Sequence, residues 1–233
     1  MGRILSISGF DGAGKTTQLN LLRELYSSRG YKTSSIFDLK NEETYFEVDE
    51  LDVYYEYLTK SDIVFSRFYL RSIKTATLQS QLMFNSTDVF NDAETAYELF
   101  QSAMFDAQLW FKKVISKLYD EGKTIVFDRY FHDEIAYRAL YSLSLAKLEK
   151  DYKNKVIPPV CSIYLKLPIR EIIGRNKNRD DNRTALFNSS EKLNELYNNY
   201  EKLIQTGNFT VLNGLCDIKT IHKKVLAAID NMV

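Results

Sequence analysis

The sequence predicts an α/β fold, a doubly wound three-layer sandwich in which a parallel sheet lies between two layers of helices. Short apolar runs alternate along the chain with longer segments of helical periodicity. The runs are apolar at nearly every position, as in strands buried on both faces of a parallel sheet. The first run leads through a glycine-rich loop into a helical segment, an order that places a ligand at the carboxyl ends of the strands.

Five segments are expected to form the strands. Each is a short, β-branched apolar run bounded by polar or turn-forming residues. They are Arg3–Ser8, Thr33–Asp38, Thr124–Asp128, Ser162–Leu167 and Phe209–Asn213.

Helical periodicity and capping residues predict four main helices between these strands. They are Lys15–Ser28, ending before Gly30; Glu94–Tyr119, ending at Gly122; Ser190–Ile204, with Ser189 as N-cap; and a last helix from the cap Asp217 through Ala228.

The segment Asn41–Asp92 departs from the alternation. It is rich in Tyr, Glu, Asp and Ser, and its periodicity favours one or two helices with a mobile connection near Asn85–Asp92. The chain lacks internal repeats and linker-like composition. We therefore expect a single domain over residues 1–233, with residues 41–92 as an insertion.

Composition narrows the function classes. The chain has 31 basic and 31 acidic residues and a net charge of zero, which argues against a general nucleic-acid or membrane-surface binder. Cys161 and Cys216 are its two cysteines, far apart in sequence, which favours reduced thiols. Neither a signal peptide nor a membrane-spanning apolar stretch is recognisable. We expect a cytoplasmic protein.

The most informative motif is Gly9-Phe10-Asp11-Gly12-Ala13-Gly14-Lys15-Thr16, an unbroken G-x-x-x-x-G-K-[ST] loop between a strand and a helix. Backbone N–H groups of such a loop surround phosphate oxygens, and glycine permits the positive φ angles that this requires. Lys15 is expected to reach the β/γ phosphates, and the Thr16 hydroxyl to bind Mg²⁺. The motif predicts a nucleoside triphosphate site.

A second motif, Asp128-Arg129-Tyr130, ends the third expected strand. A carboxylate at this point lies beside the phosphate loop and can hold Mg²⁺ directly or through water. Arg129 would project into the same crevice, where its guanidinium suits an anionic acceptor. Asp11, within the loop, would point toward the acceptor side.

A third motif follows the fourth strand. Arg175, Arg179 and Arg183 are spaced by four, so they share one face of a helix. Phosphoryl transfer spreads negative charge that a mobile, arginine-bearing lid can neutralise while excluding water. We expect this lid over about residues 170–188, although Asp180 and Asp181 could also pair with the arginines in a solvated charged helix.

These motifs resemble the thymidylate kinase family. The resemblance rests on Gly9 to Gln18, on Asp128-Arg129-Tyr130 followed by Ala136-Tyr137, and on the arginine-rich segment after Leu167-Pro168. It implies a nucleoside monophosphate kinase fold with a five-stranded sheet of order 2-3-1-4-5, ATP and Mg²⁺ as cofactors, and frequent dimerisation, with Glu94–Tyr119 as a possible dimer face. Some members of the family carry an arginine in the loop, whereas others rely on lid arginines; Gly12 fits the second group.

The acceptor half departs from that family. Phe37-Asp38-Leu39-Lys40 stands where Arg-Glu-Pro-Gly is usual, and Phe105 stands where an arginine reads the base. Asp133 and Glu134 replace other polar residues, and Arg138 replaces a glutamine. Arg67 and Arg71, in the insertion, either restore the missing cationic contacts or lie on the surface.

The expected site residues form four groups. The catalytic group is Asp11, Lys15, Arg129, Arg175, Arg179 and Arg183, and the metal ligands are Thr16 and Asp128. The nucleotide-binding group is Gly9, Phe10, Asp11, Gly12, Ala13, Gly14, Lys15, Thr16 and Thr17. The acceptor-binding group is Asp38, Arg67, Arg71, Phe105, Arg129, Tyr130, Tyr137 and Arg138.

Three functions fit these residues. The leading hypothesis is ATP-dependent phosphoryl transfer to a small nucleoside monophosphate, with dTMP as the first candidate. A deoxynucleoside kinase is an alternative, with Asp38 as the base that activates a 5′-hydroxyl. A non-catalytic nucleotide sensor or regulatory protein is the third, because the acceptor side is so altered.

Overall fold

A computed structural model describes residues 1–39, 46–84, 92–153, 155–176 and 190–230. Within them a six-stranded sheet runs in the order β2-β3-β4-β1-β5-β6, and every adjacent pair is parallel. The strands are β1 Arg3–Gly9, β2 Thr33–Ser35, β3 Ile63–Arg67, β4 Thr124–Asp128, β5 Cys161–Lys166 and β6 Phe209–Asn213.

The expected five-stranded sheet of order 2-3-1-4-5 is therefore wrong, because a sixth strand, β3, lies between β2 and β4. The missed strand is β3, whose sequence Ile-Val-Phe-Ser-Arg continues into Phe68 and Tyr69 and gave a mixed pattern within a polar segment. Its pairing with β4, in which Val64 lies opposite Ile125, buries both side chains completely. The second strand is also shorter than expected, because the chain turns at Ile36–Asp38 into a 3-10 helix, η1.

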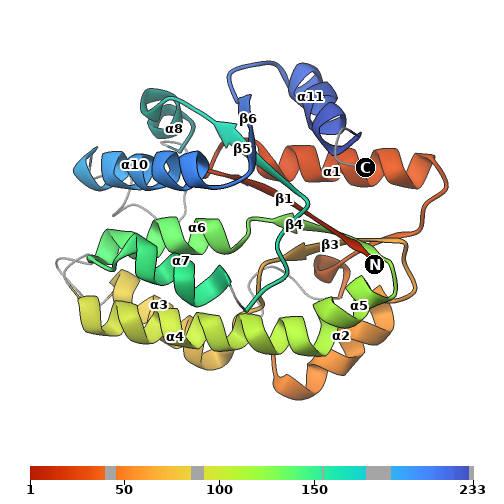
Figure 1. The fold of residues 1–233 in the computed structure, drawn as a ribbon, viewed down its shortest axis with the longest axis horizontal. Helices are drawn as coiled ribbons and strands as arrows, with labels where there is room; N and C mark the ends of the chain where they lie inside the picture. Colours follow the sequence, from red (N-terminus) through yellow and green to blue (C-terminus); the bar gives the residue numbers. More distant parts are fainter. Residues whose placement is uncertain (40–45, 85–91, 154, 177–189, 231–233) are drawn as a thin grey trace.

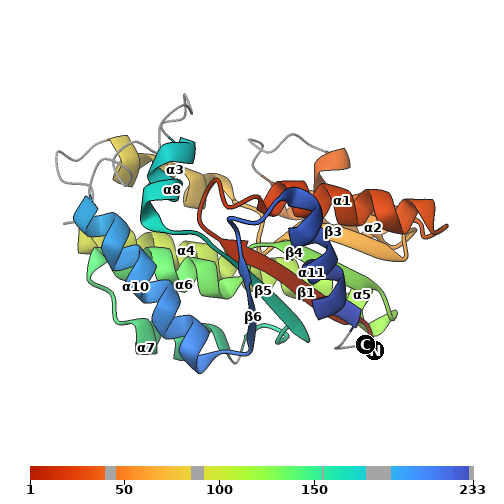
Figure 2. The same cartoon turned by 90° about the horizontal axis from the view of Figure 1, so that it is seen from above.

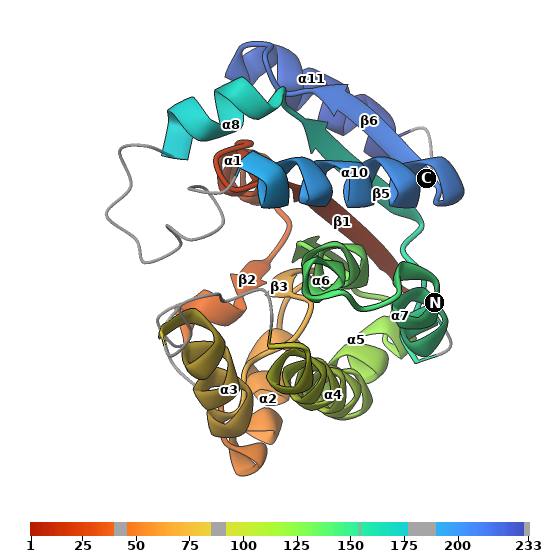
Figure 3. The same cartoon turned by 90° about the vertical axis from the view of Figure 1, so that its left-hand side faces the viewer.

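Helices cover both faces of the sheet (Figure 1). Helices α1 Lys15–Ser28 and α11 Ile218–Asp230 contact each other on one face, whereas α6 Phe131–Arg138 and α10 Ser190–Thr206 contact each other on the opposite face (Figure 3). The remaining helices are η2 Val48–Glu50, α2 Leu51–Leu58, α3 Ile73–Phe84, α4 Ala93–Trp110, a π-helix (η3) Phe111–Ile115, α5 Ser116–Asp120, η4 Ala139–Tyr141, α7 Leu145–Lys153 and α8 Ile169–Asn176. The expected parallel sheet between helical layers is confirmed.

The expected helix Glu94–Tyr119 corresponds to α4, the π-helix and α5, which follow one another without a break. Its buried side holds Phe100, Ala103, Ala107 and Trp110, each fully buried. The expected cap Asp217 accepts a hydrogen bond from the backbone N–H of Thr220 (2.9 Å). Ser189, the other expected cap, lies outside the described residues. In the part of the chain that is described, no helix is long and apolar enough to cross a membrane.

An aromatic cluster joins the segment after β3 to helices that pack against one face of the sheet. The ring of Phe68 lies 5.0 Å from that of Tyr130, 5.5 Å from that of Tyr152 and 5.9 Å from that of Phe111. These distances are typical of favourable aromatic pairs. The cluster holds the carboxyl ends of β3 and β4 against the π-helix η3, α7 and the start of α6.

Helix α3 is attached to α4 through a buried carboxylate. Asp106 is 2% exposed and accepts hydrogen bonds from the backbone N–H of Ser72 (2.9 Å), the Ser72 hydroxyl (3.0 Å) and the Thr75 hydroxyl (2.5 Å). The carboxylate thus anchors the start of α3 to α4, within the segment expected as an insertion. The connection near Asn85–Asp92 lies, except for Asp92, outside the described residues.

Replacing Asp106→Ala should lower the free energy of unfolding by about 2–3 kcal/mol, because it leaves a backbone N–H and two hydroxyl groups without their buried acceptor. Urea denaturation measures the change. Glu98→Ala is the control: Glu98 forms an exposed ion pair with Lys74 on the same two helices (3.1 Å), and its loss should cost no more than about 0.5 kcal/mol. Equal losses in both variants would contradict the anchoring role of Asp106.

Candidate functional site

The loop between β1 and α1 has the backbone that its sequence predicts. Gly9, Gly12 and Gly14 have φ angles of +139°, +81° and +94°, in the region that glycine adopts without strain. Gly14 directly precedes α1, whose first N–H groups have no partner within the helix. The loop therefore presents backbone donors at the carboxyl end of β1, between β4 and β5.

Lys15 lies across this loop. Its side chain is buried, and Nζ donates to the carbonyl oxygens of Gly9 (3.1 Å) and Phe10 (2.9 Å). Burial lowers the pKa of Lys15 to about 8, and the charge of Arg129 acts in the same direction. The positive charge of the Lys15 ammonium is thus only partly balanced within the protein, which favours the binding of an anion.

Arg129 follows β4 directly and lies against the same loop. Its φ of +69° is uncommon for a residue with a side chain, and its N–H donates to Ile7 of β1 (3.0 Å). Nη1 donates to the Gly9 carbonyl oxygen (2.9 Å) and to Asp133 (3.1 Å), while Nη2 donates to Asp11. The structure thus brings Lys15, Asp11 and Arg129 together around the end of β1.

Asp128 and Thr16 were expected to bind a metal, and their surroundings fit Mg²⁺. Asp128 lies opposite Ile7 in the sheet, and its buried Oδ1 has no hydrogen-bond partner among the described residues. Thr16 is exposed at the start of α1. Within the described ranges no group of three or more His, Cys, Asp or Glu residues could hold a metal alone. Such a site would bind Mg²⁺ together with phosphate oxygens of a ligand.

Two expected acceptor residues lie beside Arg129. The ring of Tyr137 lies 5.5 Å from the Arg129 guanidinium, within the range of a cation–π contact. Tyr130 is fully buried, and its hydroxyl donates to the carbonyl oxygen of Ile157 (2.6 Å). Tyr130 therefore contributes packing, whereas Tyr137 lines the approach to Arg129.

Arg138 is paired within α6. Its Nη2 lies 3.0 Å from Glu134 Oε2, and Glu134 Oε1 accepts a hydrogen bond from Tyr69 (3.2 Å), two residues beyond β3. The Arg138 and Glu134 side chains are 10% and 22% exposed. Because Glu134 already balances its charge, Arg138 is poorly suited to a phosphate and better suited to a neutral polar group.

Arg67 and Arg71 have local partners. The Arg67 guanidinium lies 5.0 Å from the ring of Phe37, at the carboxyl end of β3. Arg71 donates to Gln79 of α3 (3.1 Å). Arg67 ends β3, and Arg71 lies in the connection from β3 to α3.

Asp38 and Phe105 differ from the other expected acceptor residues. Asp38 accepts two hydrogen bonds from Arg23 (3.0 and 2.6 Å) and one from the N–H of Ser35 (2.8 Å). Burial would raise the pKa of Asp38, but these donors outweigh it and the pKa is lowered. Phe105 is 65% exposed, between the buried Met104 and Asp106. The structure does not bring either residue to Arg129.

The segment expected to form a lid begins as helix α8, which lies beside the phosphate loop (Figure 2). Arg175 donates to the carbonyl oxygens of Gly12 (3.0 Å) and Gly214 (3.3 Å). A side-chain carbon at Gly12 would approach Arg175 and Asn176 to 3.2 Å, so glycine permits this close packing. Arg179 and Arg183 lie outside the described residues.

Two residues that contact the site were not selected from the sequence. Asn176 donates to the backbone carbonyl oxygen of Asp11 (2.9 Å) and so joins the lid to the loop. Asp133, which had appeared only as a departure from the resembled family, accepts hydrogen bonds from Arg129 and from the N–H of Tyr130. An acidic residue in the first turn of a helix is a common N-terminal feature, so its spacing alone did not distinguish it.

Comparison with known proteins gives a consistent result. The sequence model of the thymidylate kinase family matches residues 52–225. A probable thymidylate kinase of Thermococcus kodakarensis is 26% identical over 232 residues, covering 97% of each chain, and one of Pyrococcus horikoshii is 28% identical over 232 residues, covering 98% of this chain and 96% of its own. A thymidylate kinase of Fervidobacterium nodosum is 21% identical over 226 residues, or 95% of each chain. The phosphate loop precedes the matched family segment and is independent of that match.

ATP binding without magnesium should take up protons at pH 8.5 and weaken as the pH rises above about 8. Lys15, with a pKa of about 8, is then largely neutral, and nearby phosphates favour its protonated form. Between about pH 8 and 10.5 the unfolded chain binds more protons than the folded one at this site. The contribution of Lys15 to the free energy of unfolding therefore rises with pH in that window.

Calorimetry in two buffers of different ionisation enthalpy measures the proton uptake. Lys15→Met keeps most of the apolar stem and serves as the control, with weaker binding and no uptake. Wild-type binding at pH 8.5 without proton uptake would contradict the assignment of Lys15.

Proposed function

The chain belongs to the thymidylate kinase family of nucleoside monophosphate kinases, and we propose that it transfers the γ-phosphoryl group of ATP to a nucleoside monophosphate, with dTMP as the first candidate. The observation that carries this proposal is the meeting of Lys15 and Arg129 at the Gly9 carbonyl oxygen, at 3.1 and 2.9 Å. One cation belongs to the donor loop and the other follows β4. Transfer between two phosphates needs positive charge on both sides of the moving group.

The proposed reaction follows from these positions. An oxygen of the acceptor phosphate, held by Arg129, attacks the γ-phosphorus of ATP, and the bond from that phosphorus to the β–γ bridging oxygen breaks to release ADP. Lys15 stabilises the donor phosphates, and Arg175 lies close enough to the loop to assist. Mg²⁺, held by Thr16 and Asp128 together with phosphate oxygens, would neutralise the remaining charge.

A phosphate acceptor fits the site better than a hydroxyl acceptor. A phosphate oxygen is already anionic, whereas a 5′-hydroxyl requires a base to remove its proton. Asp38, the candidate base, is occupied by Arg23 and Ser35, and the Tyr57 hydroxyl also donates to it (3.2 Å). This arrangement favours a monophosphate kinase over a nucleoside kinase.

The Glu134–Arg138 pair is compatible with thymine as the acceptor base and argues against cytosine. A carboxylate accepts hydrogen bonds and a guanidinium donates them, so the pair suits a base with a ring N–H beside a carbonyl oxygen. Thymine has this pattern, as do uracil and guanine. Cytosine has a ring nitrogen acceptor and an amino donor at these two positions. In the same orientation the amino group would face the guanidinium donor, and the ring nitrogen would face the carboxylate acceptor. Use of ATP as donor, a cytoplasmic location and dimerisation through the Glu94–Tyr119 region are carried over from the sequence as further expectations.

With ATP and Mg²⁺, dTMP should give the highest kcat/KM in a panel of dTMP, dUMP, dCMP, dGMP and the ribonucleoside monophosphates. Turnover of dCMP should be at least tenfold less efficient, since two hydrogen bonds would be replaced by repulsive contacts. A coupled assay of ADP release measures each rate, with thymidine as the unphosphorylated control. Absence of turnover with every monophosphate would disprove the proposal.

Arg129→Ala should lower kcat/KM for the preferred monophosphate by about 10²–10³, as expected for removal of a group that stabilises charge in the transition state. Asp38→Ala should lower it by less than about tenfold, because this residue supports local structure only. The same steady-state assay compares the two variants. The opposite order of losses would favour the nucleoside kinase.

A further inference from the structure

We propose that Asp133 is a positioning residue that fixes Arg129 against the phosphate loop, and that Asp11 is the exchangeable partner which an anionic acceptor replaces. The proposal rests on the proposed function, since it concerns how the acceptor phosphate is held. It assigns different tasks to two carboxylates that contact the same guanidinium.

The Asp133 carboxylate joins three parts of the fold. Oδ2 accepts hydrogen bonds from the Ser8 hydroxyl of β1 (2.7 Å) and from the Tyr130 N–H at the start of α6 (3.0 Å). Oδ1 accepts from the Tyr200 hydroxyl of α10 (2.8 Å) and from Arg129 Nη1 (3.1 Å). Both oxygens are thus engaged on two sides, as a buried carboxylate requires.

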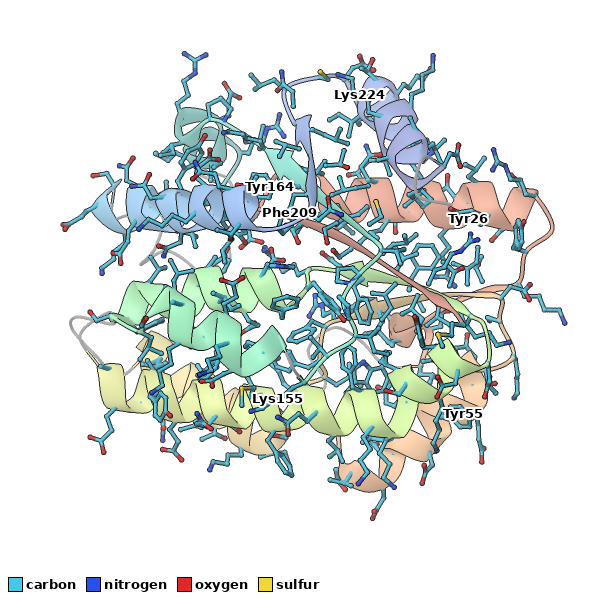
Figure 4. The ribbon with its side chains drawn as sticks, in the orientation of Figure 1. Tyr26, Tyr55, Lys155, Tyr164, Phe209 and Lys224 are labelled. Atoms are coloured by element: carbon cyan, nitrogen blue, oxygen red, sulfur yellow. The ribbon has the colours of Figure 1, made fainter. Side chains whose placement is uncertain are left out.

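The partners of Asp133 are themselves rigid. Tyr200 is 2% exposed, and its ring lies 5.2 Å from that of Phe10 in the loop and 5.2 Å from that of Tyr164 of β5, which Figure 4 labels beside α10. Ser8 is fully buried within the central strand. The position of Asp133 is therefore set by the sheet and by α10, and it transmits that position to Arg129.

The two terminal nitrogens of Arg129 have different surroundings. Nη1 donates to two fixed acceptors, Asp133 and the Gly9 carbonyl oxygen, whereas Nη2 donates to Asp11. The Asp133 side chain is 3% exposed and that of Asp11 is 14% exposed. Asp11 lies in the loop and is the more exposed of the two carboxylates, whereas removing Asp133 from its partner would leave a buried charge unpaired.

Asp133 should therefore affect the orientation of Arg129 more than the attraction of Arg129 for a phosphate. Its negative charge lies next to Arg129 and reduces the positive potential that draws in a phosphate. Its hydrogen bond holds Nη1, so that Nη2 faces the position of the acceptor. Loss of the charge should lower kcat, because a small misplacement slows the transfer, while acceptor binding should be retained.

The test compares Asp133→Asn with wild type in the presence and absence of Arg129→Ala. With Arg129 intact, Asp133→Asn should lower kcat by 10- to 100-fold and change the acceptor KM by less than about threefold. In the Arg129→Ala background the same change should lower kcat by less than twofold, since Asp133 acts through Arg129. An equal loss in both backgrounds would overturn the proposal.

A matched control and a readout that does not depend on activity complete the test. Glu201→Gln, on α10 beside Tyr200, makes the same carboxylate-to-amide change in the ion pair with Lys166 (2.7 Å) and should leave kcat within about twofold. Side-chain NMR of Arg129 should show faster Nη1–H exchange in Asp133→Asn than in wild type and Glu201→Gln. Unchanged exchange would overturn the proposal, whereas a wild-type enzyme without turnover would disprove the proposed function instead.

Discussion

The carbonyl oxygen of Gly9 is the point on which both halves of the site depend. It accepts hydrogen bonds from Lys15 and from Arg129, which come from different elements of the fold. Gly9 ends the central strand β1. A side-chain carbon at this position would approach the Leu165 carbonyl oxygen to 2.8 Å, so only glycine fits here. Two cations this close repel each other, and Asp11 and Asp133 offset that repulsion. The proposed donor and acceptor sides are thus joined through one backbone atom.

Buried carboxylates hold the acceptor side together. Asp133 joins β1, α6 and α10, and Asp106 joins α3 to α4. Each accepts hydrogen bonds on both oxygens or from several donors, so each fixes a direction as well as a distance. Apolar packing by Phe68 and its aromatic neighbours supplies the contact area, while the carboxylates determine how the elements are oriented. The segment expected as an insertion departs from simple strand–helix alternation, and directional contacts such as that of Asp106 fix its orientation against α4.

Much of the central fold could be predicted because its information is local. Apolar runs marked β1, β4, β5 and β6, and glycine spacing marked the loop. Strand β3 was missed because its five residues lie among tyrosines and charged residues, and its pairing with β4 identifies it only in the folded chain. The same limit applies to Arg138. Arg138 is expected from the sequence to bind the acceptor, but its pairing with Glu134, one helical turn earlier, is visible only in the folded chain.

Local sequence patterns were enough to identify the phosphate loop, the alternation of strands and helices, and the place of Asp128 and Arg129 at a strand end. These features depend on backbone conformations and apolar patterns within a few neighbouring residues. Which side chains meet depends instead on how distant segments pack. Arg129 contacts Asp11 across 118 positions, and Tyr200 contacts Asp133 across 67. Such pairs depend on strand order and helix packing, because a hydrogen bond requires its two atoms to lie within about 3 Å and no local pattern encodes that distance.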